Sequence, residues 1–120
     1  MIQITKCEKV KTPQGAFYLG PSTKECSEGY LELKPYSSLT LHNRKGGIEN
    51  LKQVEGRCIM IVFDKEGGTN HLLKEGDELT IEPEGVLHIH TNPFKKKCIT
   101  YWKFEGDIRR IIEDIRKGIE

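Results

Sequence analysis

The stretch PEGVLHIHTN, residues 83–92, carries the strongest signal for the fold of this chain. Pro83 and Gly85 are typical of a turn that leads into a strand. The residues that follow alternate between apolar and polar, so His88 and His90 share one face of the predicted strand. Two histidines on one face of a short strand form a candidate site for a metal ion or a polar ligand.

An earlier segment carries a matching pattern, because His42, Glu49 and Gly56 follow one another at a characteristic spacing. Taken together, the two segments resemble the two motifs of the cupin family, G-x5-H-x-H-x3-4-E-x6-G and G-x5-P-x-G-x2-H-x3-N. The second motif is matched position by position by Pro83, Gly85, His88 and Asn92. The resemblance spans about residues 28–104. It implies an all-β fold, the double-stranded β-helix or jelly-roll barrel of the cupins.

Three positions depart from the cupin pattern. Arg44 stands where the first motif has its second histidine, and Tyr36 stands where that motif begins with glycine. Gly76 lies one residue further from Pro83 than the second motif has it. The change at Arg44 removes one of the four side chains, three histidines and one glutamate, that usually hold the cupin metal.

The resemblance implies His42, Glu49 and His88 as the metal ligands of this chain. Two imidazoles and one carboxylate can hold Fe(II), Mn(II), Ni(II) or Zn(II), and the same set with open positions occurs in oxygenases. His90 lies on the same face as His88 and is therefore a candidate third nitrogen ligand.

Arg44 favours the opposite interpretation, a polar pocket without metal. The permanent positive charge of a guanidinium disfavours a divalent ion beside it. An ion pair between Arg44 and Glu49 would instead place the guanidinium where cupins hold the metal. In such a pocket the expected ligand-binding residues are Arg44, Gln53 and His90.

Short runs rich in β-branched and aromatic residues recur along the chain between turn residues, which is typical of a sandwich or closed barrel. The predicted strands are residues 2–10, 16–19, 30–33, 39–43, 51–54, 57–63, 71–73, 79–81, 86–91 and 99–104. The last segment changes to helical spacing at Ile108, Ile111, Ile112 and Ile115. Asp107 can cap this helix through its carboxylate. We therefore expect one domain, residues 1–120, with a C-terminal α-helix at about 107–118.

Two predicted strands, residues 58–63 and 99–104, are apolar on both faces, and such strands are buried on both sides. We expect the face with His42 and His88 to line the barrel. The opposite face, which we expect to lie beneath a cover, carries Leu39, Leu41, Leu87 and Ile89. The candidate covers are the C-terminal isoleucines, the N-terminal strands and a second copy of the chain. We therefore predict a homodimer, as in many cupins.

The composition argues against several classes of protein. Nineteen Lys and Arg residues against 18 Asp and Glu leave no excess charge to attract nucleic acid or an anionic membrane. The short cluster 95–97, KKK, is typical of a solvated loop. No stretch approaches the roughly 20 apolar residues of a membrane span, and the N-terminus lacks the core of a signal peptide, so we expect a cytoplasmic protein. The four cysteines form no C-x-x-C pair, which excludes a zinc ribbon.

Three functions remain open at this point. The first is binding of a small molecule, such as a carboxylate or sugar acid, in the barrel without an obligatory metal. The second is a divalent-metal-dependent enzyme, isomerase-like or dioxygenase-like, that uses His42, Glu49 and His88. The third is a vestigial cavity in a protein that acts by association through its outer face. Neither the fold nor the motifs identify the substrate, because one barrel serves many chemistries.

Overall fold

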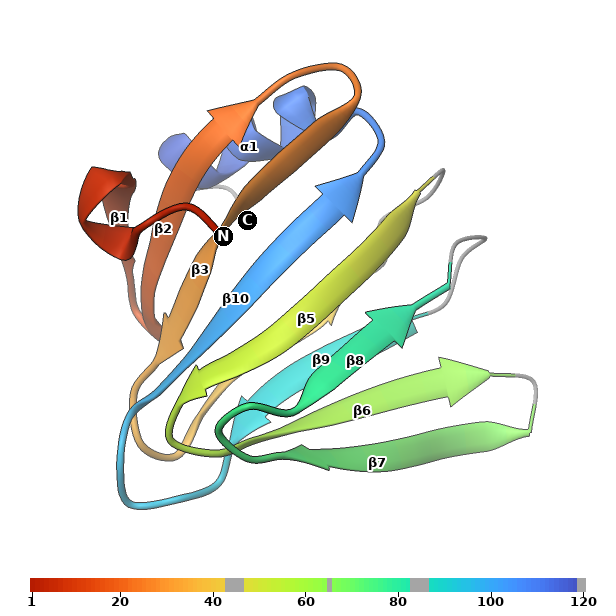
Figure 1. The fold of residues 1–120 in the computed structure, drawn as a ribbon. Helices are drawn as coiled ribbons and strands as arrows, with labels where there is room; N and C mark the ends of the chain where they lie inside the picture. Colours follow the sequence, from red (N-terminus) through yellow and green to blue (C-terminus); the bar gives the residue numbers. More distant parts are fainter. Residues whose placement is uncertain (43–46, 65, 83–86, 119–120) are drawn as a thin grey trace.

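Two antiparallel sheets and a C-terminal helix make up the part of the chain that the computed structural model describes, residues 1–42, 47–64, 66–82 and 87–118 (Figure 1). Of residues 40–42 and 64 only the backbone is described. The elements are η1 (Ile4–Lys6), β1 (Glu8–Thr12), β2 (Gly15–Ser22), β3 (Cys26–Leu33), β4 (Ser37–His42), β5 (Ile48–Glu55), β6 (Cys58–Asp64), β7 (Gly67–Leu73), β8 (Glu78–Ile81), β9 (Leu87–Asn92), β10 (Cys98–Glu105) and α1 (Arg109–Arg116).

The six-stranded sheet has the order β1-β2-β3-β10-β5-β8, and the four-stranded sheet has the order β4-β9-β6-β7. The two sheets face each other across a common core (Figure 1). Their inner faces supply most of its buried apolar side chains, among them Phe17, Leu31, Leu33, Leu51, Met60, Trp102 and Phe104. This arrangement confirms the predicted all-β jelly roll with a helix at its C-terminal end.

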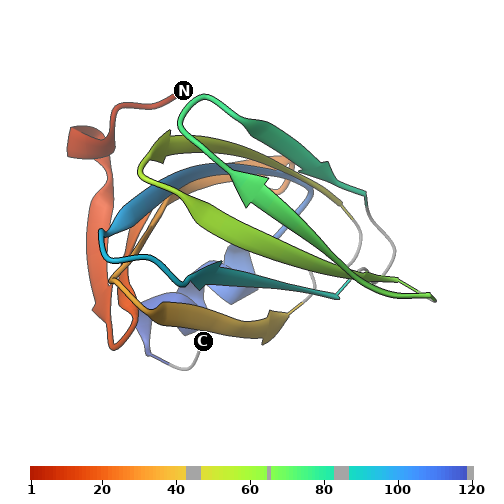
Figure 2. The ribbon, with the colours of Figure 1, turned by 90° about the horizontal axis from the view of Figure 1, so that it is seen from below.

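The two sheets differ in width, and helix α1 compensates for the difference. The inner face of β2 and β3 extends beyond the narrower sheet, and α1 lies against it (Figure 2). Ile108, Ile112 and Ile115 are buried there, in contact with the core. Of the three candidate covers for the outer face of the strands, the C-terminal isoleucines are therefore excluded. They cover an inner face, because six strands leave apolar surface that four strands cannot reach.

Helix α1 is held at both ends by charged side chains. The N-cap position is Ile108, but the carboxylate of Asp107, one residue earlier, accepts a hydrogen bond from the backbone N–H of Arg109 at 3.1 Å, so it bonds to the first turn as predicted. At the other end, Arg116 Nε lies 3.0 Å from Glu8 Oε1 of β1. The helix is shorter than predicted, and none of the helices in the described ranges is long and apolar enough to cross a membrane.

The N-terminal segment, one of the three candidate covers, lies on the outer face of β3 and β10 and not on the face of Leu87 and Ile89. Ile2, Ile4, Cys7 and Tyr18 pack there against Tyr30, Ile99 and Tyr101. The predicted strand from residue 2 is wrong, however, because the chain first forms η1 and begins β1 at Glu8. Side chains of β3, rather than the backbone of a paired strand, bond to the backbone of Ile2. Glu28 accepts a hydrogen bond from the Ile2 N–H at 2.8 Å, and Tyr30 donates one to the Ile2 carbonyl at 2.5 Å.

The outer face of the four-stranded sheet is apolar and has no cover among the described residues. Leu72 and Leu87 are exposed, whereas Ile59, Ile61, Phe63 and Ile89 are half-buried. Register pairs these residues across β7, β6 and β9, so they form one continuous surface. The predicted outward orientation of Leu87 and Ile89 is confirmed.

The N-terminal cover leads to a prediction for alkaline pH. Burial, followed by the charge of Glu28, raises the pKa of Tyr101 to about 12. An unfolded tyrosine has a pKa of about 10, so this stabilisation is fully present below pH 10 and is lost as the pH rises toward 12. We expect the free energy of unfolding to fall by on the order of 2 kcal/mol over this range because of Tyr101.

The measurement is urea unfolding at pH 9, 10, 11 and 12. In Tyr101→Phe, most of the fall in the free energy of unfolding that we attribute to Tyr101 should be absent. In Tyr36→Phe, which changes an exposed ring, the free energy of unfolding should fall as much as in the wild type. An equal loss in wild type and Tyr101→Phe would show that ionisation of Tyr101 does not limit alkaline stability.

Candidate metal site

Three buried side chains from the two sheets converge in the barrel. Glu49 lies on β5 of the six-stranded sheet, and His88 and His90 lie on β9 of the four-stranded sheet. One donor atom from each lies within 4.8 Å of the other two. The predicted alternation of His88 and His90 is confirmed, since both side chains point to the interior.

One close contact in this group joins His88 and Glu49. His88 Nε2 lies 3.2 Å from Glu49 Oε2, and the His88 side chain is only 1% exposed. The rings of His88 and His90 meet edge to face, with centroids 5.5 Å apart and an angle of 67° between the planes. A carboxylate in so little solvent is costly unless polar or charged partners surround it, and the imidazoles provide such an environment.

Strand β9 is central to the site because it is paired on both sides. His88 lies opposite Val62 and His90 opposite Met60 on β6, and Met60 is fully buried. The other neighbour is β4, where His42 lies opposite His88 in the backbone register. The side chain of His42 lies outside the described residues, as do Arg44, Pro83 and Gly85.

A register shift between β4 and β9 corrects one prediction. Leu39 pairs with His90 and His42 pairs with His88, so two residues of β4 oppose Ile89 alone. Such a bulge interrupts the alternation of faces along a strand. Leu39 is consequently buried on the inner side, beside His90, and its predicted place on the outer face is wrong.

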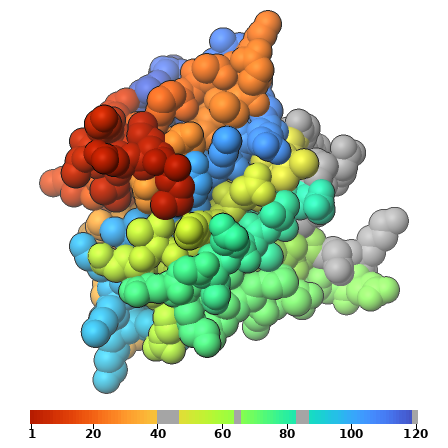
Figure 3. Space-filling model, viewed as in Figure 1, coloured from red at the N-terminus to blue at the C-terminus, as the bar shows by residue number. Residues whose placement is uncertain are grey.

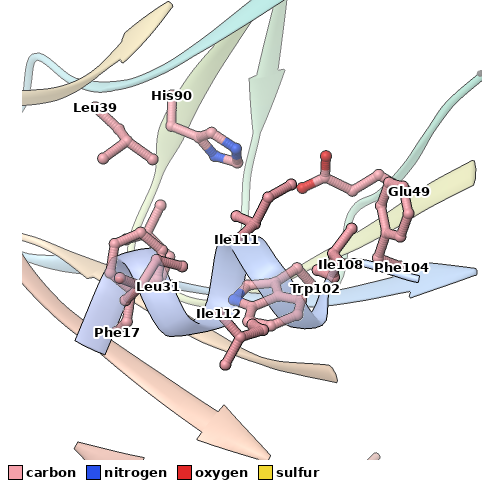
Figure 4. A pocket seen from close by; sticks show the side chains of 11 residues that line it. Phe17, Leu31, Leu39, Glu49, His90, Trp102, Phe104, Ile108, Ile111 and Ile112 are labelled. Atoms are coloured by element: carbon pink, nitrogen blue, oxygen red, sulfur yellow. The ribbon is translucent and has the colours of Figure 1, made fainter. Parts of the chain in front are cut away.

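The site opens into a small cavity of about 20 Å³ (Figure 4). Glu49 and His90 form its polar wall, and α1 closes the opposite side with its isoleucines. Ile111 of α1 extends toward the gap between His90 and Glu49 (Figure 4). A volume of this size holds about one water molecule or one ion. The isoleucine pattern predicts a buried helix face, but nothing in the sequence indicates that this face closes the cavity.

Trp102 lines the same cavity and carries a buried indole N–H. Its side chain is 8% exposed and lines the wall. The indole Nε1 is buried, and it has no hydrogen-bond partner within the described part of the chain.

Gln53 is also buried in the barrel, but it does not line this cavity. Its carbonyl oxygen accepts hydrogen bonds from Thr100 Oγ1 at 2.7 Å and Cys58 Sγ at 3.1 Å. Its amide nitrogen donates to the carbonyls of Glu55 and Gly56. These contacts occupy both ends of the amide, so Gln53 ties β5, β6 and β10 together at the other end of the barrel.

The residues at the convergence fit a first-row divalent metal ion. Metal–nitrogen and metal–oxygen bonds of about 2.0–2.2 Å place neighbouring ligand atoms about 3–4 Å apart. The distance of 3.2 Å between His88 Nε2 and Glu49 Oε2 meets this spacing. The three donor atoms all lie within 4.8 Å of one another, so His90 would need only a small movement to bind the same ion. Two imidazoles and a carboxylate suit Fe, Mn, Ni and Zn.

Searches by sequence find nothing similar: no family model matches this chain, and no curated protein matches it. Solved structures do match. The cupin domain of Cnp3 from Schizosaccharomyces pombe has a TM-score of 0.74 at 16% identity, covering 100% of this chain and 81% of that one. An RmlC-like cupin from Shewanella frigidimarina has a TM-score of 0.74 at 17% identity, covering 89% of this chain and 90% of that one.

A recombinant oxalate oxidase in complex with glycolate has a TM-score of 0.73 at 17% identity. The match covers 88% of this chain but only 58% of the oxalate oxidase chain. Identities this low carry information on architecture and none on activity. The structural matches, together with the two sheets and the buried Glu and His residues, show that this chain has the cupin fold.

Proposed function

We propose that this protein is a metal-binding cupin-fold protein in which Glu49, His88 and His90 hold one divalent transition-metal ion. The convergence of three buried donor side chains within 4.8 Å supports this proposal. The donors come from opposite sheets, so the packing of the barrel, rather than one flexible loop, sets their separation. The site differs from the predicted set by including His90, while His42 remains a candidate fourth ligand.

The cavity volume favours a metal ion over an organic ligand. Pockets for small organic molecules usually measure about 300–1,000 Å³. The cavity beside Glu49 measures about 20 Å³, which is far below that range. Binding of a sugar acid without metal, the first function expected from the sequence, would require α1 to move away. An ion requires no such movement.

The chemistry of the bound ion would be Lewis-acid or redox catalysis, according to the metal. The free space beside Glu49 takes no more than an ion or a water molecule, so a substrate could reach the ion only if α1 moved away. Trp102 and the isoleucines of α1 would then line its route. Three protein ligands leave positions open for a substrate, as the predicted isomerase-like or dioxygenase-like reactions require. Oxalate is a suitable first probe, because two solved structures of the same fold are named as an oxalate oxidase and an oxalate decarboxylase.

Metal content tests the proposal directly. We expect protein purified without chelator, or reconstituted with Fe(II), Mn(II), Ni(II) or Zn(II), to retain close to one ion per chain. Glu49→Gln, His88→Ala and His90→Ala should each weaken metal binding by at least about tenfold, since loss even of an outer-shell partner costs about 10–100-fold. Elemental analysis and competition with a chelator provide the measurements.

His71→Ala is the matched control, because His71 lies on β7 and does not line the cavity. It should leave metal affinity unchanged. Retention of no metal under any of these conditions would overturn the proposal. It would leave the metal-free interpretation, in which Arg44 pairs with Glu49.

We also propose that the protein forms a homodimer through the outer face of the four-stranded sheet. This face presents Ile59, Ile61, Phe63, Leu72, Leu87 and Ile89. The described residues that complete it are Ser38, Gly68, Asn70 and Thr91, so no described side chain on it is charged. A symmetric dimer brings each residue near its own copy, and a face without charges avoids like-charge repulsion.

Ile61→Lys tests the dimer. Ile61 lies in the middle of this face, between Asn70 and Ile89, so a lysine there would place two like charges within the interface. We expect wild type at twice the mass of one chain by light scattering, and Ile61→Lys at the mass of one chain. Thr80→Lys, on exposed β8 of the other sheet, should remain dimeric. A monomeric wild type would contradict the proposal.

A further inference from the structure

A second hollow lies at the other end of the barrel, where the loops β3–β4, β5–β6 and β9–β10 come together (Figure 1). It has a volume of about 550 Å³, within the range usual for small-molecule sites. Its wall includes Tyr36, Gly56, Arg57, Phe94, Lys95 and Lys96. None of these residues lines the cavity beside Glu49.

Tyr36 is the most unusual residue of this hollow. Its φ angle of 57° makes it the one non-glycine residue with positive φ in the described part of the chain. A bulky side chain in the left-handed region is strained, and the cupin motif has glycine at this position. The side chain is 68% exposed, so little packing offsets the strain. A strained, exposed aromatic ring at the edge of a hollow indicates a role in binding.

The hollow combines aromatic rings with positive charge. The guanidinium carbon of Arg57 lies 4.0 Å from the centre of the Phe94 ring. Stacking of this kind fixes the guanidinium plane and leaves its N–H groups at the edge, where they can donate to an anion. Lys95 and Lys96 are exposed beside it, on the loop that protrudes at the lower left of Figure 3. No carboxylate is present among the described lining residues.

The walls of the hollow are fixed from inside the barrel by Asn92. Its fully buried amide donates to the carbonyls of Leu33 and Lys34, in front of the Tyr36 turn, and to the carbonyl of Lys96. Its carbonyl oxygen accepts a hydrogen bond from the Phe94 N–H at 3.1 Å. One side chain thus joins the loop of Tyr36 to the loop of the cations. A site whose walls are already ordered loses little entropy on binding.

From this combination we infer that the hollow binds a planar ring that carries a phosphate, of the chemical class of a nucleoside monophosphate. The ring of Tyr36 stacks on the base, because its face is open to solvent. Arg57 donates to the phosphate in the plane of its guanidinium, and Lys95 and Lys96 neutralise the remaining charge. These three cations outnumber the nearby carboxylate of Glu75, whose Oε1 accepts a hydrogen bond from the Gly56 N–H at 3.0 Å, and so favour a doubly charged phosphate over a single carboxylate.

Calorimetric titration with AMP in the presence of a chelator tests this inference apart from the metal site. Wild type should bind AMP at least tenfold more tightly than adenosine and than inorganic phosphate, because the site contacts both parts. His88→Ala should bind AMP as wild type does. Loss of AMP binding in that variant, with the fold intact, would place AMP at Glu49 and His90 and overturn the inference.

The variants of Tyr36 separate binding from folding. Tyr36→Asn should weaken AMP binding at least tenfold without lowering the thermal midpoint, since asparagine tolerates the left-handed region. Tyr36→Phe keeps the ring and should bind within about twofold of wild type, since stacking on a base needs only the ring face. Arg57→Gln should also weaken AMP binding at least tenfold. Lys11→Gln, which removes one exposed charge from β1, should not.

Three results would overturn the inference. Equal affinity for AMP and inorganic phosphate would show that the ring contributes nothing. Wild-type affinity in Tyr36→Asn would remove the proposed role of the strained residue. Tighter binding of a single-stranded oligonucleotide than of AMP would assign the surface to nucleic acid instead.

Discussion

The difference in width between the two sheets is the constraint on which the rest of this structure depends. Six strands present more apolar inner surface than four strands can cover, and α1 buries the remainder with three isoleucines. Each such side chain contributes about 1.5–3 kcal/mol when it leaves water. The same helix closes the barrel beside Glu49 and reduces the free space there to about 20 Å³. Stability and access to the site are therefore set by one element.

Strand β9 serves both ends of the barrel. Alternate residues of its inner face, His88, His90 and Asn92, are all buried. The two histidines face Glu49 across the interior, whereas Asn92 bonds to backbone groups of two loops. Strand β9 is hydrogen-bonded to β4 on one side and to β6 on the other. The backbone of β9 therefore positions both the histidines of the candidate metal site and Asn92, which fixes the walls of the open hollow.

The small cavity and the open hollow differ in what they can accept. The cavity offers nitrogen and oxygen donors in almost no free volume, which suits an ion. The hollow offers aromatic rings and cations around about 550 Å³, which suits an organic anion. Polar groups inside the barrel that belong to neither site bond to one another, as Gln53 does with Thr100 and Cys58. This network ties β5, β6 and β10 together between the two sites.

The sequence by itself determined the fold class, through two motifs that resemble those of the cupins, and the C-terminal helix, through the period of its isoleucines. Alternation, a local property of the chain, placed His88 and His90 on one face of β9. The resemblance and the strands that are apolar on both faces indicated that this face points inward. The sequence also singled out Glu49, His88 and His90 as candidates. Only the tertiary structure decided that Leu39 turns inward at a bulge and that Tyr36 adopts a left-handed backbone. Only the tertiary structure decided, too, that the isoleucines close the cavity. Register and relative sheet width depend on contacts between segments far apart in the chain, which no local pattern encodes.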